Sequence, residues 1–135
     1  MASGCRHCSR HGDVSPLVLV VDPNSGVGEA LALAVALNTR AHVERVAGGV
    51  EAVTIVARRS VDLVIAAAHL PDVSLGVLMY LLRRLQPDLP IAILGETPHP
   101  MEMGRQRADG HFSKPFELKP FLGWVGDRLS QAPVA

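Results

Sequence analysis

The stretch Val61–Pro71 constrains the fold of this chain more than any other. It reads VDLVIAAAHLP, an apolar run that Asp62 and Pro71 bracket, with β-branched residues near its start. A short apolar run bounded by turn residues is typical of a central parallel strand, which is buried on both faces. In an open parallel sheet the functional crevice lies outside the carboxyl ends of the strands. We therefore expect Ala67 and the loop after it to lie at that crevice.

Apolar runs on both sides of this stretch predict four more strands, separated by helices. The strands are expected at 17–22, 41–47, 91–95 and 111–113, and the helices at 26–38, 50–59, 75–86 and 117–131, with Ser25 as the cap of the first. Between 96 and 110 we expect at most one or two helical turns around 101–107, because Pro98, Pro100 and Gly104 break longer helices. This alternation predicts a parallel sheet with helices on both faces.

Apolar residues at helical spacing predict which side of each helix packs on the sheet. The predicted core stripes are Val27, Leu31, Ala34 and Val35, widened by Leu33 and Leu37, in the first helix; Leu75, Leu78, Met79, Leu82 and Leu85 in the third; and Leu118, Phe121, Leu122, Val125 and Leu129 in the last.

The chain has the size and composition of one folded domain. It has 135 residues, of which 48% are apolar and 19% charged, and its net charge is zero. We expect the domain at 16–131, between a flexible leader at 1–15 and a tail at 132–135. A neutral chain lacks the basic field that attracts nucleic acid or an anionic membrane, and its longest apolar run, Ala30–Leu37, is too short to span a bilayer. Its first residues lack the apolar segment of a signal peptide, so we expect a cytoplasmic protein.

The leader carries both cysteines of the chain. Cys5, Cys8 and His11 have ligand types and a local spacing that zinc can use, but no later cysteine supplies the second half of a site. We therefore assign no metal site and interpret these side chains as incidental. Adventitious metal, or metal bridging two chains, is the alternative.

Several motifs in a fixed order resemble those of response-regulator receiver domains, which act in two-component signalling. They are Val-Val-Asp at 20–22, Ala-Gly-Gly-x-Glu-Ala at 47–52, Asp-Leu-Val at 62–64, Leu-Leu-Arg-Arg-Leu at 81–85 and Lys-Pro-Phe at 114–116. The resemblance covers Leu17 to Leu129. It implies an α/β, flavodoxin-like (βα)5 fold, a three-layer sandwich around a parallel five-stranded sheet of order 2-1-3-4-5.

The resemblance also implies a phosphorylation site, and this chain departs from it. In the family two acidic residues after the first strand bind Mg²⁺ together with the phosphoacceptor Asp, a Thr or Ser follows the fourth strand, and a Lys follows the fifth. Here Asp22 matches the first acid and Lys114 the lysine, but Pro23, Ala67 and Gly95 occupy the other positions. A methyl group cannot attack a phosphoryl donor, so we expect a degenerate receiver, or pseudo-receiver, that is not an enzyme, takes no cofactor and has lost or weakened Mg²⁺ binding.

Three interpretations of the crevice stay open. Asp22 and Lys114 can pair across it as a structural contact, which we favour. Asp22 can instead bind a metal or a small anion together with His69 and His99, which lie in neighbouring loops. Asp72, beyond the end of the central strand, is a conceivable substitute phosphoacceptor.

These patterns predict a stand-alone domain that acts in signal transduction by phosphorylation-independent binding to another protein. The partner is expected to be a signalling protein such as a histidine kinase, or a second copy of the chain. The alternative is a small-ligand or metal sensor that uses the vacated crevice.

The candidate interaction surface centres on Trp124, about 120° from the middle of the core stripe of its helix. Aromatic side chains of this size are enriched at binding hot spots. His111, which lies where the family often has a switching aromatic, and Phe112 and Tyr80 complete the candidate surface. The alternative is that the Trp124 ring folds back near Met101 and Met103.

Overall fold

The computed structural model describes residues 15–95, 107–112 and 117–130. These residues form one five-stranded sheet in the order β2-β1-β3-β4-β5, and every neighbouring pair of strands is parallel. The strands are β1 (Leu17–Val21), β2 (His42–Val46), β3 (Leu63–Ala67), β4 (Ile91–Leu94) and β5 (Gly110–Phe112), and the helices are α1 (Ser25–Asn38), α2 (Gly49–Arg58), α3 (Leu75–Leu85) and α5 (Leu118–Ser130). The predicted fold class and strand order are confirmed.

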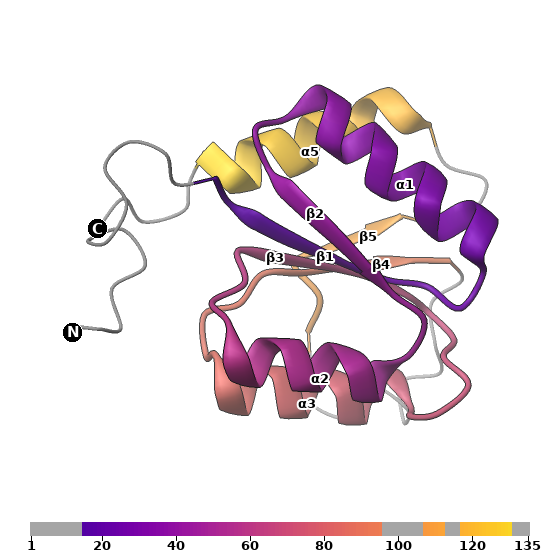
Figure 1. Ribbon diagram of the computed structural model, residues 1–135, viewed down its shortest axis with the longest axis vertical. Helices are drawn as coiled ribbons and strands as arrows, with labels where there is room; N and C mark the ends of the chain where they lie inside the picture. Colours follow the sequence, from indigo (N-terminus) through magenta and orange to yellow (C-terminus); the bar gives the residue numbers. More distant parts are fainter. Residues whose placement is uncertain (1–14, 96–106, 113–116, 131–135) are drawn as a thin grey trace.

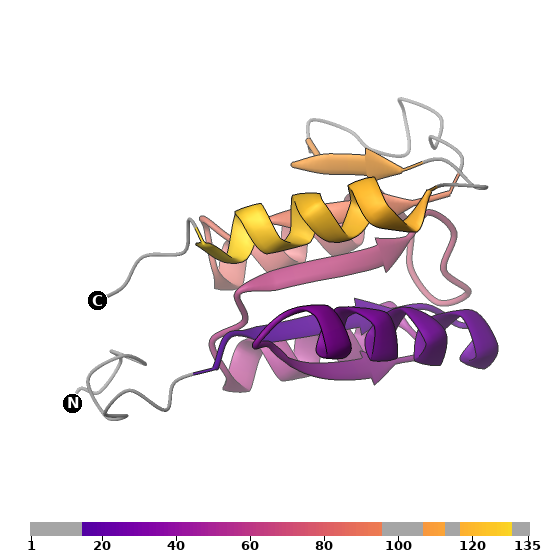
Figure 2. The ribbon, with the colours of Figure 1, turned by 90° about the horizontal axis from the view of Figure 1, so that it is seen from above.

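The helices form two layers, one on each face of the sheet. α1 and α5 cover one face, and α2 and α3 cover the other (Figure 1). Figure 2 shows α1 and α5 side by side over the sheet, where they contact each other. No helix in the described part of the chain has the length and apolar content needed to cross a bilayer.

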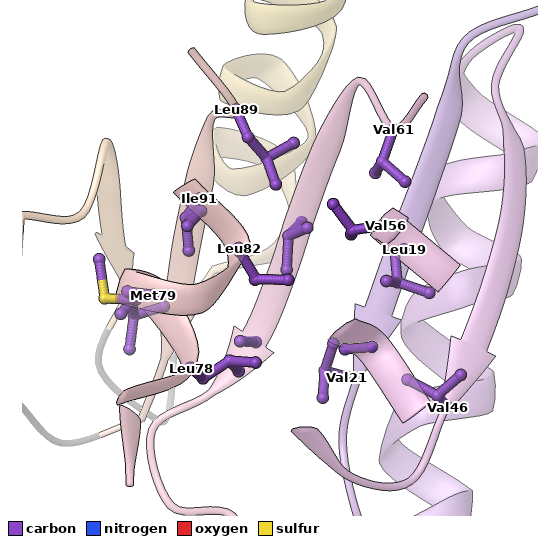
Figure 3. Close-up of a cluster of buried hydrophobic side chains, with 14 of the residues drawn as sticks. Leu19, Val21, Val46, Val56, Val61, Leu78, Met79, Leu82, Leu89 and Ile91 are labelled. Carbon is purple, nitrogen blue, oxygen red and sulfur yellow. The ribbon is translucent and has the colours of Figure 1, made fainter. Parts of the chain in front are cut away.

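The central strands are apolar because both of their faces are covered. All five residues of β3 are buried, and successive side chains alternate between two core clusters. Val64 and Ala66 belong to the cluster beneath α2 and α3, whereas Leu63 and Ile65 belong to the cluster beneath α1 and α5. Figure 3 shows the first of these clusters, in which side chains from β1 and β4 meet those of α3.

The start of the central strand is tied to its neighbour by Asp62. The Asp62 carboxylate accepts a hydrogen bond from the Leu17 amide at 2.8 Å, and the Asp62 amide donates to the Leu17 carbonyl at 2.8 Å. This pair of bonds fixes the alignment of β3 on β1, which determines what meets at their carboxyl ends. The acidic residue of the Asp-Leu-Val motif therefore has a structural role here.

The first helix begins differently from the prediction. Asn24, not Ser25, is the N-cap, and its Oδ1 accepts a hydrogen bond from the Val27 amide at 3.1 Å. Asn and Ser are nearly equivalent N-caps, so the residue type alone does not fix where the helix begins. Asn24 is the cap because it has the extended backbone angles of the residue before the first helical turn. The other helices and strands begin and end within two residues of their predicted limits. The leader, the tail and the turns expected around 101–107 lie outside the described residues.

Four leucines assigned to core stripes point away from the sheet. Leu33 is 59% exposed and Leu37 75%, while Leu85 and Leu118 are nearly half exposed. In α1 only Gly28, Leu31 and Val35 are buried, because one face of a single helix is all that the sheet covers. Leu33 and Leu37 were wrongly assigned to the core because α1 has a single charged residue, Glu29. The sequence therefore does not show which side of this helix faces the solvent.

Candidate functional site

The carboxyl edge of the sheet brings together three of the residues that the sequence singled out. Ala67 ends β3 beside Leu94, the last residue of β4, and Asp22 directly follows β1. Backbone hydrogen bonds continue past the strands, from the Asp22 amide to the Val46 carbonyl at 3.0 Å and from the Gly95 amide to the Phe112 carbonyl at 2.9 Å. Asp22, Ala67 and Gly95 therefore lie at the same edge, on three adjacent strands.

Asp22 is buried, with 2% of its surface exposed. Its Oδ1 accepts a hydrogen bond from the Asn24 amide at 2.8 Å, which holds the turn between β1 and α1. Its Oδ2 is buried and has no hydrogen-bond partner within the described residues. Leaving a buried oxygen without a partner costs free energy, so a cation or a hydrogen-bond donor that reached this oxygen would remove that cost. Lys114 lies outside the described residues, and its pairing with Asp22 stays a prediction.

Arg45 is a site residue that the sequence reasoning missed. From β2 its Nη2 donates a hydrogen bond to the main-chain carbonyl of Asp22 at 2.7 Å. The Arg45 side chain packs closely against α1 at Gly28, where an added Cβ atom would lie 2.7 Å from the Arg45 Nε. The Nε is buried and has no partner in the part of the chain that the structure describes. The glycine inside the first helix was the signal for this close approach.

Gly95 has a backbone conformation that a hydroxyl residue would find strained. Its φ is +119°, in the region that glycine alone adopts readily. A Cβ atom at this position would lie 3.2 Å from the Cβ of Ala68. The backbone is held on both sides, because the Gly95 amide donates to Phe112 and its carbonyl accepts a hydrogen bond from His111 Nε2 at 2.8 Å. The backbone at this position therefore suits glycine and disfavours a residue with a side chain, such as Thr or Ser.

Asp72 caps a helix from a distant loop. Its Oδ1 accepts a hydrogen bond from the Gly49 amide and its Oδ2 one from the Val50 amide, both at 3.0 Å. These bonds, that from Val50 first, lower the pKa of the Asp72 carboxyl below its ordinary value. A Cβ at Gly48 would lie 2.8 Å from Asp72 Oδ2, so the small residue leaves room for the cap. With both oxygens bonded to α2, Asp72 is poorly suited to act as a phosphoacceptor.

The loop between β3 and α3 lines a shallow, open hollow of about 350 Å³, bordered by residues 68–75. His69 lies on it and is exposed, whereas His99 lies outside the described residues. No group of three or more His, Cys, Asp or Glu within the described ranges is placed to hold a metal ion. Cys5, Cys8 and His11 are also outside these ranges, so their role stays a prediction.

Trp124 is partly buried against β5. Its ring packs edge-on to Phe112, with the ring centroids 5.7 Å apart, and a Cβ at Gly110 would lie 2.7 Å from the ring. The guanidinium of Arg128 lies 5.4 Å from the centroid of the same ring. Met101 and Met103 lie outside the described residues, so the alternative position near them is not described. The structure thus covers part of the ring within the chain, and its role in an interface stays a prediction.

The other candidate interface residues lie apart from one another. His111 and Phe112 belong to β5, next to Trp124, and His111 links this strand to the end of β4 through Gly95. Tyr80 lies on α3, on the opposite face of the sheet, where it is 50% exposed and has the Arg84 guanidinium 5.9 Å from its ring centroid. His111 and Phe112 also point to opposite faces of the sheet, because their partners Ile93 and Leu94 belong to different core clusters. The four residues therefore do not form one continuous surface.

Solved structures that resemble this chain include receiver domains and response regulators. The signal receiver domain of an HD domain-containing protein from Pseudomonas fluorescens Pf-5 has a TM-score of 0.77 and 22% identity, and the match covers 87% of this chain and 96% of that one. The non-phosphorylated HemR receiver domain from Leptospira biflexa has a TM-score of 0.74 and 26% identity over 88% and 98% of the two chains. A putative response regulator from Chloroflexus aurantiacus J-10-fl has a TM-score of 0.76 and 25% identity over 87% and 100%.

By sequence alone the chain matches no known protein family and no curated protein. The likeness to receiver domains therefore rests on the fold.

Proposed function

We propose that this chain is an atypical receiver domain that acts in signal transduction by binding another protein without being phosphorylated. The observation that carries the proposal is Gly95, whose φ of +119° suits glycine and disfavours the Thr or Ser of an ordinary receiver. Ala67, on the neighbouring strand, offers no nucleophile. The nucleophile and the hydroxyl that handle a phosphoryl group in ordinary receivers are thus absent. At the hydroxyl position the backbone also favours glycine.

Mg²⁺ binding is proposed to be lost or weak, and no other cofactor is proposed. Mg²⁺ requires several oxygen ligands in octahedral geometry. Asp22 supplies one carboxylate at the edge of the sheet, whereas Pro23 and Ala67 supply none. An enzymatic role is not proposed, because no nucleophile and base lie together among the described residues of this site.

A signalling protein such as a histidine kinase is the proposed partner, and the cytoplasm the proposed location. The outer side of α3 supports a protein partner, because Val77, Tyr80 and Leu85 are each about half exposed there, at 50%, 50% and 46%. Apolar side chains gathered on one side of a surface helix are typical of protein interaction sites. The neutral net charge argues against nucleic acid or an anionic membrane as the partner.

The experiment is recovery of binding partners from an extract of the source cells, with the full chain as bait, with and without acetyl phosphate and Mg²⁺. The expected result is the same set of partners under both conditions. Tyr80→Glu should reduce recovery, whereas Glu117→Gln, an exposed change near the start of α5, should leave it unchanged as the matched control. A partner that binds only after treatment with the phosphoryl donor would contradict the proposal.

A second candidate function, sensing of a metal or small ligand in the crevice, has one observation in its favour. Asp22 Oδ2 and Arg45 Nε are buried without partners among the described residues, one at the edge of the sheet and the other beside α1. Burying a polar atom without a hydrogen-bond partner costs free energy, and a ligand that bonded to either atom would remove this cost. Thermal unfolding across a series of divalent cations and small anions tests the idea. A rise in the midpoint for wild type that is absent in Asp22→Asn would support it, and no rise with any ligand would refute it.

A further inference from the structure

Helix α1 is apolar on its outer side as well as on the side that faces the sheet. Its 14 residues, SGVGEALALAVALN, include a single charged residue, Glu29. A helix that is apolar all round is normally covered all round. Here the sheet and α5 cover only the side that carries Gly28, Leu31 and Val35.

The uncovered side presents a line of Leu and Ala. Leu37 is the most exposed large hydrophobic residue among the described residues, at 75%, and Leu33 is 59% exposed. Ala30 and Ala36 are exposed beside them. In Figure 2 no other described element lies over α1 on the side away from the sheet. We call Ala30, Leu33, Ala36 and Leu37 the α1 outer face.

The charges around the α1 outer face are complementary to one another. Glu29 lies near the start of the helix, Arg40 lies two residues past its end, and both are exposed. Neither makes an ion pair with another described residue. A face with an acidic start, an apolar middle and a basic end matches a second copy of itself in the opposite direction.

The spacing of the residues makes this match specific. In an antiparallel pair of α1 helices, Leu33 of one copy can face Leu37 of the other, and the reverse contact then forms by symmetry. In that alignment the start of one α1, with Glu29, lies beside the end of the other α1, which Arg40 follows two residues later. Each copy would thus contribute one acid and one base to two equivalent ion pairs.

We propose that the α1 outer face is the contact surface of a two-fold symmetric homodimer in which two α1 helices pack antiparallel. Small residues at the contact, such as Ala30, let two helices approach closely. A helix of this length is about 21 Å long, so a single helix pair buries less than the roughly 1,200–2,000 Å² of a stable complex. The dimer is therefore weak and reversible. This inference does not depend on the proposed function.

Sedimentation equilibrium of the full chain over a range from micromolar to millimolar concentration is the test. Wild type is expected to dimerise as concentration rises. Leu37→Glu places two like charges in the apolar contact, and the dissociation constant should rise at least tenfold. Val50→Glu is the control, because it places the same charge at an apolar side chain that is 60% exposed on α2, on the opposite face of the sheet, and it should leave association unchanged.

A charge-swap cycle tests the antiparallel alignment. Glu29→Arg alone and Arg40→Glu alone should each weaken the dimer, and the double variant should restore it, because the pairs re-form with exchanged signs. Circular dichroism checks that every variant is folded. A wild-type monomer at all concentrations would overturn the proposal. A dimer disrupted by Val50→Glu but not by Leu37→Glu would overturn it as well, and so would a double variant in which dimerisation is not restored.

Discussion

Replacement of Gly95 by threonine tests whether the backbone at the edge of the sheet is adapted to the missing hydroxyl. Holding a non-glycine residue at a φ of +119° costs about 1–3 kcal/mol. The new Cβ would lie 3.2 Å from the Cβ of Ala68, and crowding of this kind in a packed region typically costs a further ~1–3 kcal/mol. The backbone has little freedom to relax, because hydrogen bonds to Phe112 and from His111 hold it. We therefore expect Gly95→Thr to lower the free energy of unfolding by about 2–6 kcal/mol, the sum of the two costs.

Urea unfolding followed by circular dichroism measures this loss. With a slope of about 2 kcal/mol per molar urea, the midpoint should fall by about 1–3 M. Gly95→Ala should lose a smaller part of the same free energy. Gly123→Ala in α5 is the control, since nothing lies within 4 Å of its Cβ position, and it should stabilise the protein by about 0.5–1 kcal/mol. A Gly95→Thr variant as stable as wild type would refute the argument, because the site would then accept the ordinary receiver residue.

Three further predictions follow from contacts elsewhere in the site. Asp72→Ala should destabilise the start of α2. Hydrogen bonds from Val50 and Gly49 lower the pKa of the Asp72 carboxyl in the folded state. The stability that Asp72 contributes is therefore complete above the pKa of this carboxyl in the unfolded chain, and it is lost as pH falls through the lower pKa of the folded state. The difference between wild type and Asp72→Ala in urea unfolding should therefore vanish in strong acid, and a difference that persists there would contradict this. Trp124→Ala should cost about 2–4 kcal/mol, because the ring fills the space over Gly110 beside Phe112; unchanged stability with weaker association in sedimentation would instead support an interface role. Ala67→Asp should still bind Mg²⁺ weakly in calorimetry, because Pro23 supplies no carboxylate, and tight binding would count against this account of the site.

The sequence predicted the sheet well because its pattern is local and strong. Runs such as that in β3 are apolar throughout, and only a strand buried on both faces places every side chain inside. The shorter β5 also came within a residue of its predicted position. The parallel order followed from the alternation of strands and helices and from the resemblance to receiver domains.

The contacts that shape the site could not be predicted, because they join residues far apart in the chain. Asp72 caps α2 across 23 positions, and Arg45 reaches back to the Asp22 carbonyl over the same separation. Neither bond leaves a local pattern, apart from the glycines at 28 and 48 that make room for the side chains. The positive φ of Gly95 likewise depends on how β4 leaves the sheet.

The exposed leucines of α1 show a different limit. Periodicity identifies a core face only where polar residues mark the opposite side, and α1 offers Glu29 alone. Leu33 and Leu37 were therefore assigned to the core, and their exposure became visible only in the structure. The same lack of polar residues makes this side of the helix a candidate contact surface.

The most direct test of the central claim is the intact mass of the full chain after incubation with acetyl phosphate and Mg²⁺, beside an ordinary receiver domain as the positive control. The account predicts no change in mass for this chain, because Ala67 stands where the nucleophile would be and both oxygens of Asp72 are bonded to α2. The control should gain one phosphoryl group under the same conditions. A gain of one phosphoryl mass on this chain, removed by acid or base as expected of an acyl phosphate, would contradict the account.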